Sequence, residues 1–137
     1  MSTQTFRAGA ATTDFTPRRP LPNYNNSLCT PDQDSSPLLC HAVVADDGNT
    51  VAAIVSVDVT FVDRQLLLAI RDKCEHVVGI SAANIFVGAT HTHAAPASCP
   101  SFLNGALPDP LFIDHLVEAV ATSVKKAYDS IRPALLK

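Results

Sequence analysis

The chain has no excess of basic residues. Among its 137 residues, Lys and Arg number 10 and Asp and Glu number 13, so the net charge is −3. Nucleic-acid-binding domains ordinarily carry a basic patch, and this composition therefore argues against a nucleic-acid partner. No apolar run approaches the roughly 20 residues that a membrane-spanning helix needs. The first 15 residues also lack a basic segment followed by an apolar one, so no signal peptide is visible and we expect a cytoplasmic protein.

Paired cysteine motifs are also missing. The four cysteines, Cys29, Cys40, Cys74 and Cys99, form no C-x-x-C pair and no zinc-ribbon spacing. Without an export signal, we expect reduced thiols. Cys74 lies in a helical pattern and is expected to pack as a small apolar side chain. Cys99 follows a pair of histidines and is a candidate ligand or nucleophile, although no basic partner lies beside it.

What the chain does have is a folded protein's balance of 47% hydrophobic and 17% charged residues. Its length suits one domain, or the N-terminal fragment of a larger catalytic domain. Alternating or continuous apolar runs predict strands over residues 7–16, 38–45, 51–57 and 84–89, with a hairpin turn at 46–49. A helix is predicted to begin at the Thr60-x-x-Asp63 motif and to end at Gly79. A long second helix is predicted from Asp109-Pro110 to Pro133.

These elements predict an α/β fold: a mixed sheet with a strand–helix–strand unit and a long C-terminal helix. The run at 51–57 is apolar throughout, which is typical of a strand buried on both faces. Residues 17–37 and 94–109 are read as Pro-rich loops, and the first is long enough to be a functional loop or a lid. Residues 134–137 resemble the start of an unpaired strand, and such an open edge could recruit a second copy of the chain.

The candidate site lies at the end of the strand that precedes Thr90-His91-Thr92-His93. Side chains two residues apart on a strand share one face, so His91 and His93 can enter one pocket. Imidazole is the commonest metal ligand and the readiest proton carrier near neutral pH. Asp58 ends the preceding parallel strand and is expected at the same edge, where ligands of α/β sheets bind. Thr90 and Thr92 would point away or accept hydrogen bonds that orient the imidazoles.

Structural roles remain open for each of these residues. The two histidines could bond loop carbonyls and hold a turn, and Asp58 could cap the next helix or accept from turn amides. Asp14 is read as a turn residue, and His41, His76 and His115 as structural or surface positions. Two histidines do not complete a catalytic zinc site, which ordinarily has three protein ligands. The chain therefore contains part of a site.

Three segments resemble neutral ceramidases and their bacterial relatives. They are Arg7-Ala-Gly-Ala-Ala-Thr-Thr-Asp14-Phe-Thr-Pro17, Ile54-Val-Ser-Val-Asp58 and Asn84-Ile-Phe-Val-Gly-Ala-Thr-His-Thr-His-Ala-Ala-Pro96. Their order and spacing agree with that family over nearly the whole chain. Two departures stand out: Ala94-Ala95 replaces the family's Ser-Gly, and the family's glycine-tyrosine element is not clear near Tyr24.

The resemblance implies a zinc-dependent amidase that cleaves an N-acyl amide such as that of a sphingolipid. It implies that His91 binds the zinc and that His93 lies in the same site, with further ligands downstream of this chain. Asp58 is a candidate to orient substrate or water. Two alternatives stay open: another metal hydrolase with a His-x-His strand end, such as an amidohydrolase barrel, and a truncated, non-catalytic paralogue that acts as an oligomerisation or interaction domain.

Overall fold

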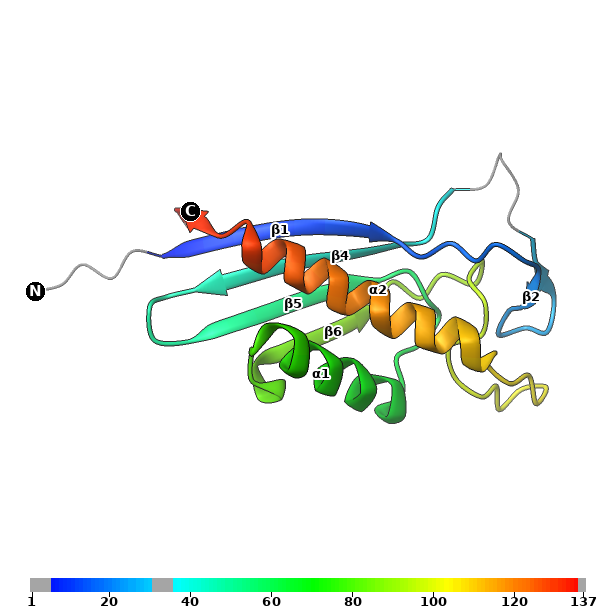
Figure 1. The fold of residues 1–137 in the computed structure, drawn as a ribbon. Coiled ribbons are helices and arrows are strands. Elements are labelled where there is room, and N and C mark those ends of the chain that lie inside the picture. Colours follow the sequence, from blue (N-terminus) through cyan, green and yellow to red (C-terminus); the bar gives the residue numbers. More distant parts are fainter. Residues whose placement is uncertain (1–5, 31–35, 136–137) are drawn as a thin grey trace, which may run out of the picture.

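The computed structural model describes residues 6–30 and 36–135. Within them, a five-stranded sheet in the order β6-β5-β4-β1-β7 lies behind two helices (Figure 1). The elements are β1 (Arg7–Asp14), β2 (Leu21–Pro22), β3 (Leu28–Cys29), β4 (Leu39–Asp46), β5 (Val51–Val57), α1 (Arg64–Val78), the 3₁₀ turn η1 (Ala82–Asn84), β6 (Ile85–Ala89), α2 (Pro110–Asp129) and β7 (Arg132–Pro133). The predicted α/β fold, with its strand–helix–strand unit and long C-terminal helix, is confirmed.

The sheet is mixed and open in the described residues. β5 and β6 run parallel around the crossover helix α1, whereas β1, β4, β5 and β7 pair antiparallel. A barrel of parallel strands, which an amidohydrolase would require, is therefore not formed by the described part of the chain. No helix in that part is long and apolar enough to cross a bilayer.

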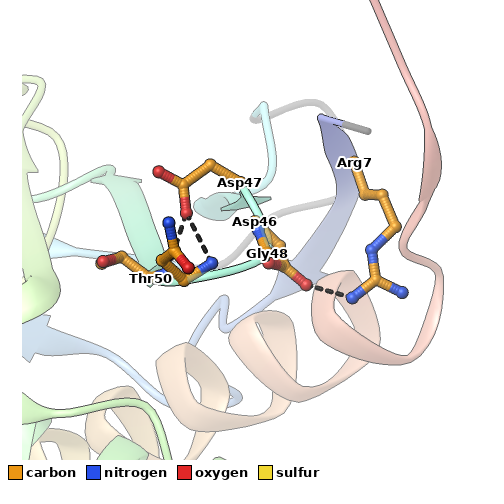
Figure 2. Close-up of polar contacts among 6 residues, drawn as sticks. Arg7, Asp46, Asp47, Gly48 and Thr50 are labelled. Carbon is orange, nitrogen blue, oxygen red and sulfur yellow. Dashed lines mark hydrogen bonds and ion pairs between the residues drawn. The ribbon is translucent and has the colours of Figure 1, made fainter. Parts of the chain in front are cut away.

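The predicted hairpin joins β4 to β5 through a turn built by two aspartates (Figure 2). Asp46 accepts a hydrogen bond from the Gly48 amide at 2.7 Å and pairs with the Arg7 guanidinium of β1. Asp47 accepts from the Thr50 amide at 2.8 Å. Gly48 has φ 89°, a left-handed conformation that glycine adopts without strain. The turn therefore sets the hairpin register and ties it to β1.

Both helices cover the same face of the sheet (Figure 1). α2 packs against β1, β4 and β5, and α1 packs against α2. The core side chains of this face include Cys40, Ala42, Val44, Ala53, Val55, Val57, Ile85, Leu66, Ile70, Leu116, Val120 and Val124. Buried Ser123 on α2 lies within hydrogen-bond distance of the carbonyls of Ala11 and Cys40, which satisfies its hydroxyl between two strands.

The opposite face of the sheet is open, which corrects the prediction that residues 51–57 are buried on both sides. Ile54 of β5 is 60% exposed, and its neighbours Val43 and Phe86 in the sheet register are also exposed. A continuous apolar run reports how many faces of a strand are apolar. It does not report how many of them the chain itself covers.

The start of α1 lies later than predicted. Asp63, not Thr60, is the N-cap, because its carboxylate accepts from the Leu66 amide at 2.8 Å. Aspartate is as good an N-cap as serine or threonine, and the Thr60 side chain is engaged elsewhere. Gly79 ends the helix in the predicted left-handed conformation, with φ 80°. The buried stripe of the helix is Leu66, Ile70 and Cys74.

The C-terminal strand also differs from its prediction. α2 begins as expected, with Asp109 as N-cap and Pro110 in its first turn, but it ends at Asp129. The strand that follows is Arg132–Pro133, and it pairs with β1 instead of standing unpaired after Pro133. The Ala134 amide continues this pairing with the Phe6 carbonyl at 2.9 Å. Residues 136–137 of the predicted strand lie outside the described residues.

The predicted loop at 17–37 contains regular structure. β2 and β3 form a two-stranded hairpin, separate from the main sheet, that is pinned to the segment after the histidines. An antiparallel β-bridge joins Asn23 to Pro96, and the Ala97 amide donates a hydrogen bond to the Pro22 carbonyl at 2.9 Å. Residues 31–35 of this loop lie outside the described residues.

Gly9 provides a test of how closely α2 approaches β1. A Cβ at Gly9 would lie 2.0 Å from the Ala127 carbonyl oxygen, which belongs to the helix backbone and cannot move aside. We expect Gly9→Ala to lower the free energy of unfolding by about 3 kcal/mol, the upper end of ordinary overpacking costs. Urea unfolding measures this change.

Gly88→Ala is the matched control for that substitution. A Cβ at Gly88 would come no closer than 4.0 Å to another side chain, the Phe86 ring, so this variant should keep nearly the wild-type stability. Equal stabilities for the two variants would contradict the close approach of α2 to β1.

The hairpin turn predicts a pH dependence of stability. The hydrogen bond from the Gly48 amide and the nearby Arg7 guanidinium lower the pKa of Asp46. Hydrogen bonds from the amides of Thr50 and Asn49 lower the pKa of Asp47. A carboxyl whose pKa is lowered on folding stabilises the protein above its unfolded pKa, and this contribution is lost as the pH falls through the folded pKa. In urea unfolding at neutral and acid pH, the double variant Asp46→Asn/Asp47→Asn should lose less stability on acidification than the wild type. An unchanged acid dependence would contradict this assignment.

Candidate functional site

The site begins where the parallel pairing of β5 and β6 continues beyond the two strands. The Thr90 amide donates to the Val57 carbonyl at 2.9 Å, and the His91 amide donates to the Val59 carbonyl at 3.0 Å. The two chains therefore leave the sheet side by side, at the edge where ligands of α/β sheets bind. The predicted placement of the histidines at this edge is confirmed.

His91 is held in one orientation by its own backbone and by its neighbour strand. Its φ is 66°, a left-handed conformation that is uncommon outside glycine and that recurs at functional sites. Nδ1 lies 2.8 Å from the Thr60 carbonyl oxygen, which can only accept, so Nδ1 carries the hydrogen. In the neutral imidazole, Nε2 then has a free lone pair. The Phe61 ring packs edge-on against the imidazole, with centroids 4.9 Å apart.

His93 faces His91 across the strand end. The two Nε2 atoms are 3.4 Å apart and the ring planes are 84° apart. On its other side, Nδ1 of His93 lies 3.3 Å from the Asn25 carboxamide nitrogen, and the His93 carbonyl accepts from Asn23 at 3.2 Å. With Asn25 donating, neutral His93 carries its hydrogen on Nε2 and donates it toward His91. Both imidazoles are exposed, so this pair is open to a ligand.

The β2–β3 hairpin supplies the second wall of the site. The Asn23 side chain accepts from the amides of Asn25 and Ser27, both at 3.0 Å, and so shapes the turn that presents Asn25 to His93. Tyr24 is buried, and its ring packs against Phe61 with centroids 5.0 Å apart. The long loop that the sequence predicts to be functional or a lid therefore contacts His93 through its described residues.

Thr60 links the two segments that meet at the site. Its hydroxyl donates to the Thr92 carbonyl at 2.8 Å, while its own carbonyl accepts from His91. The orienting acceptor is therefore the backbone of Thr60, not the side chain of Thr90 or Thr92. The Thr92 hydroxyl accepts from the Ala94 amide at 3.3 Å and stabilises the turn after the histidines.

Asp58 reaches the predicted edge but turns toward β4. Its Oδ2 accepts from the Leu39 amide at 2.9 Å, and its own amide donates to the Leu39 carbonyl at 3.1 Å. No hydrogen bond joins it to either histidine in the described residues. The structure thus brings His91 and His93 together and gives Asp58 the amide-bonding role that its sequence position also allowed.

The remaining candidates are the four cysteines and the other three histidines. All four cysteines lie in the described residues and are free. Burial, with a smaller effect of nearby Asp63, raises the pKa of the Cys99 thiol, which disfavours the thiolate that a ligand or nucleophile needs. Cys74 is buried as predicted, and burial raises its pKa to about 11. His41, His76 and His115 are exposed, as expected.

Sequence reasoning missed four residues that shape the site: Asn23, Asn25, Thr60 and Phe61. Asn23 and Asn25 lie in an Asn-rich run within the loop, which was a usable turn signal. Thr60 was interpreted as a helix cap because its spacing to Asp63 fits that motif. Nothing in the local pattern distinguishes Phe61 from an ordinary core residue.

Comparison with known proteins identifies the fold. No family model and no curated protein matches the sequence. Among solved structures, the chain is similar to the neutral ceramidase of Pseudomonas aeruginosa, with a TM-score of 0.76 and 15% identity. It is also similar to a ceramidase described as complexed with C2, with a TM-score of 0.72 and 16% identity. Each alignment covers 95% of this chain and 22% of the other, so the chain spans about a fifth of their length and shares their fold over that part.

Thr60 offers a test of the junction that holds His91. Thr60→Val keeps the shape of the side chain but leaves the Thr92 carbonyl without its donor, so the free energy of unfolding should fall by about 1–3 kcal/mol. Thr122→Val, at an exposed position on α2, is the matched control and should change stability little. Urea unfolding distinguishes them; a Thr60→Val protein as stable as the control would contradict the role of this hydroxyl.

Proposed function

We propose that this chain is the N-terminal part of a ceramidase-like, zinc-dependent amide hydrolase that acts on an N-acyl amide such as that of a sphingolipid. One observation carries the proposal: on a fold shared with neutral ceramidase, the Thr60 carbonyl fixes the His91 imidazole so that Nε2 keeps the lone pair that a metal needs. A backbone acceptor on the second ring nitrogen is the usual support of a metal-binding histidine.

The histidine pair fits a zinc ion in part. Zinc binds imidazole nitrogen at about 2.0–2.1 Å in tetrahedral sites, so two ligand nitrogens on one ion lie roughly 3.3–3.4 Å apart. The 3.4 Å between the Nε2 atoms of His91 and His93 has this value, and both could bind one ion once rotation of the Asn25 carboxamide moves the His93 hydrogen to Nδ1. No group of three or more His, Cys, Asp or Glu side chains that could hold a metal occurs in the described residues, so a full ligand set would need donors from elsewhere.

In the proposed site, His91 holds the zinc through Nε2. When bound, zinc supplies a water whose pKa is near 7 and polarises the scissile carbonyl. His93 lies next to it, and its Nε2 can donate to or accept from substrate or water, depending on which nitrogen Asn25 leaves protonated. Rotation of the Asn25 carboxamide would present its oxygen to Nδ1 and free Nε2 as an acceptor. Asp58 acts as a positioning residue by fixing the end of β5 against β4.

A non-catalytic interaction domain is the second candidate, and one observation favours it. The open face of the sheet carries Val43, Ile54 and Phe86 in one exposed row, which a second copy or another chain could cover. Metal binding that does not depend on His91 would favour this candidate over the hydrolase.

Zinc binding to the isolated chain tests the hydrolase proposal. We expect weak binding, because the ligand set is incomplete, and no hydrolysis of N-acyl lipids by this chain alone. His91→Ala should weaken zinc binding by at least about tenfold in calorimetric titration. His76→Ala, which removes an exposed imidazole at the end of α1, should not change it.

Two results would overturn the proposal in different ways. Equal zinc affinity in the wild type and in His91→Ala would remove His91 as a ligand. A tight, stoichiometric zinc site with turnover by these 137 residues would show that the chain is not an incomplete part of a larger site.

A further inference from the structure

Four large apolar side chains project from the segment that follows the histidine motif. Phe102, Leu103, Leu107 and Leu111 are 83%, 66%, 68% and 71% exposed, and we call them the apolar tip. The segment that carries them follows the histidines and runs into the first turn of α2, at the end of the sheet where β5 and β6 finish (Figure 1). Scattered apolar residues are normal on protein surfaces, but a group within ten residues beside a candidate site is not.

The segment that precedes α2 and carries most of the apolar tip is a turn held by its own backbone hydrogen bonds. The Ser101 amide donates to the Ala106 carbonyl at 2.8 Å, and the Gly105 amide donates to the Ser101 carbonyl at 3.0 Å. The Asn104 carboxamide donates to the Tyr24 carbonyl at 3.2 Å, which joins this turn to the β2–β3 hairpin. Ser101 and Ala106 are themselves buried. Polar and small residues thus hold the turn, and the large apolar ones are exposed, with the Phe102 ring also edge-on to the Tyr24 ring at a centroid distance of 6.0 Å.

The charges around the apolar tip suit a phospholipid surface. Residues 98–108 contain no charged side chain, so nothing in the turn opposes its insertion among lipid chains. Leu111, in the first turn of α2, lines a cleft of about 650 Å³ whose charged residues are Arg18, Arg19, Asp14 and Asp109. Arg19 pairs with Asp109 at 2.6 Å, whereas Arg18 is exposed and has no ion-pair partner in the described residues. Interfacial anchors combine apolar groups with basic side chains, and Arg18 supplies one such charge beside the tip.

We propose that the apolar tip inserts into the interfacial region of a phospholipid bilayer and holds the histidine edge against it. A protein partner fits less well, because protein interfaces ordinarily use roughly 20–30 residues a side and the tip offers four apolar side chains, three before α2 and one in its first turn. The purpose of the contact rests on the proposed function, since a lipid amide resides in such a surface. The contact itself requires neither zinc nor hydrolysis.

Vesicle co-sedimentation in the presence of a chelator tests the contact. The wild type should bind phosphatidylcholine vesicles, and binding should strengthen when phosphatidylglycerol is included. Phe102→Ser/Leu103→Ser and Leu107→Ser/Leu111→Ser should each lower the partition coefficient at least about tenfold, because each pair removes two inserted apolar groups. Arg18→Gln should lower binding about fivefold, and only to the vesicles that contain phosphatidylglycerol.

Ile54→Ser is the matched control, because it removes an exposed apolar side chain from the open sheet face. It should bind as the wild type does. The chain contains no tryptophan, so Leu107→Trp adds a single reporter whose emission should shift to shorter wavelength on vesicles. This reporter decides the question even if a serine variant fails to fold.

The outcomes separate this proposal from that of the hydrolase. His91→Ala should bind vesicles normally while losing zinc affinity. Absence of vesicle binding by the wild type, an unshifted Leu107→Trp emission, or an equal loss in Ile54→Ser would overturn the membrane contact and leave the zinc proposal untouched. If the wild type self-associates instead of binding vesicles, and the serine variants abolish this, the apolar tip is a protein contact and the proposal is wrong.

Discussion

The candidate site depends on the continuation of parallel β5–β6 pairing past the ends of both strands. The Val57 and Val59 carbonyls accept from Thr90 and His91, and the Thr60 carbonyl then accepts from the His91 ring. The backbone of one segment thus orders the backbone and the side chain of the other. A histidine placed in this way does not need to order itself when a ligand arrives, which lowers the entropic cost of binding.

The same junction explains why the long loop is part of the site. The β2–β3 hairpin is too small to be stable alone, and its contacts with Pro96, Ala97 and Phe61 provide what its own pairing lacks. The hairpin also places the Asn25 carboxamide against Nδ1 of His93, the ring nitrogen that does not face His91. The histidine pair therefore has a backbone partner on one side and a side-chain amide on the other, and only the second can reverse its hydrogen-bonding role.

The open sheet face and the apolar tip are two different kinds of exposed apolar surface. The first is a flat row on regular strands, with Val43, Ile54 and Phe86 aligned by the sheet register. The second projects from a turn beside the proposed zinc ligand and has an arginine at its flank. Flat apolar sheet faces suit another layer of protein, whereas the uncharged turn at residues 98–108 suits a fluid lipid surface. Similar composition therefore leads to different expectations, because shape and neighbours differ.

Local patterns in the sequence determined the α/β class, the hairpin turn, the caps at Asp109 and Gly79, and the placement of His91 and His93 at a strand end. Each of these follows from interactions within a few residues or from the alternation of a strand. The tertiary structure alone decided that Thr60 binds the histidine segment instead of capping α1, that Asn25 contacts His93, that Asp58 turns to Leu39, and that one face of β5 stays open. These outcomes depend on contacts between segments distant along the chain, and the periodicity of a single segment carries no information about which partner satisfies its polar groups or covers its apolar face.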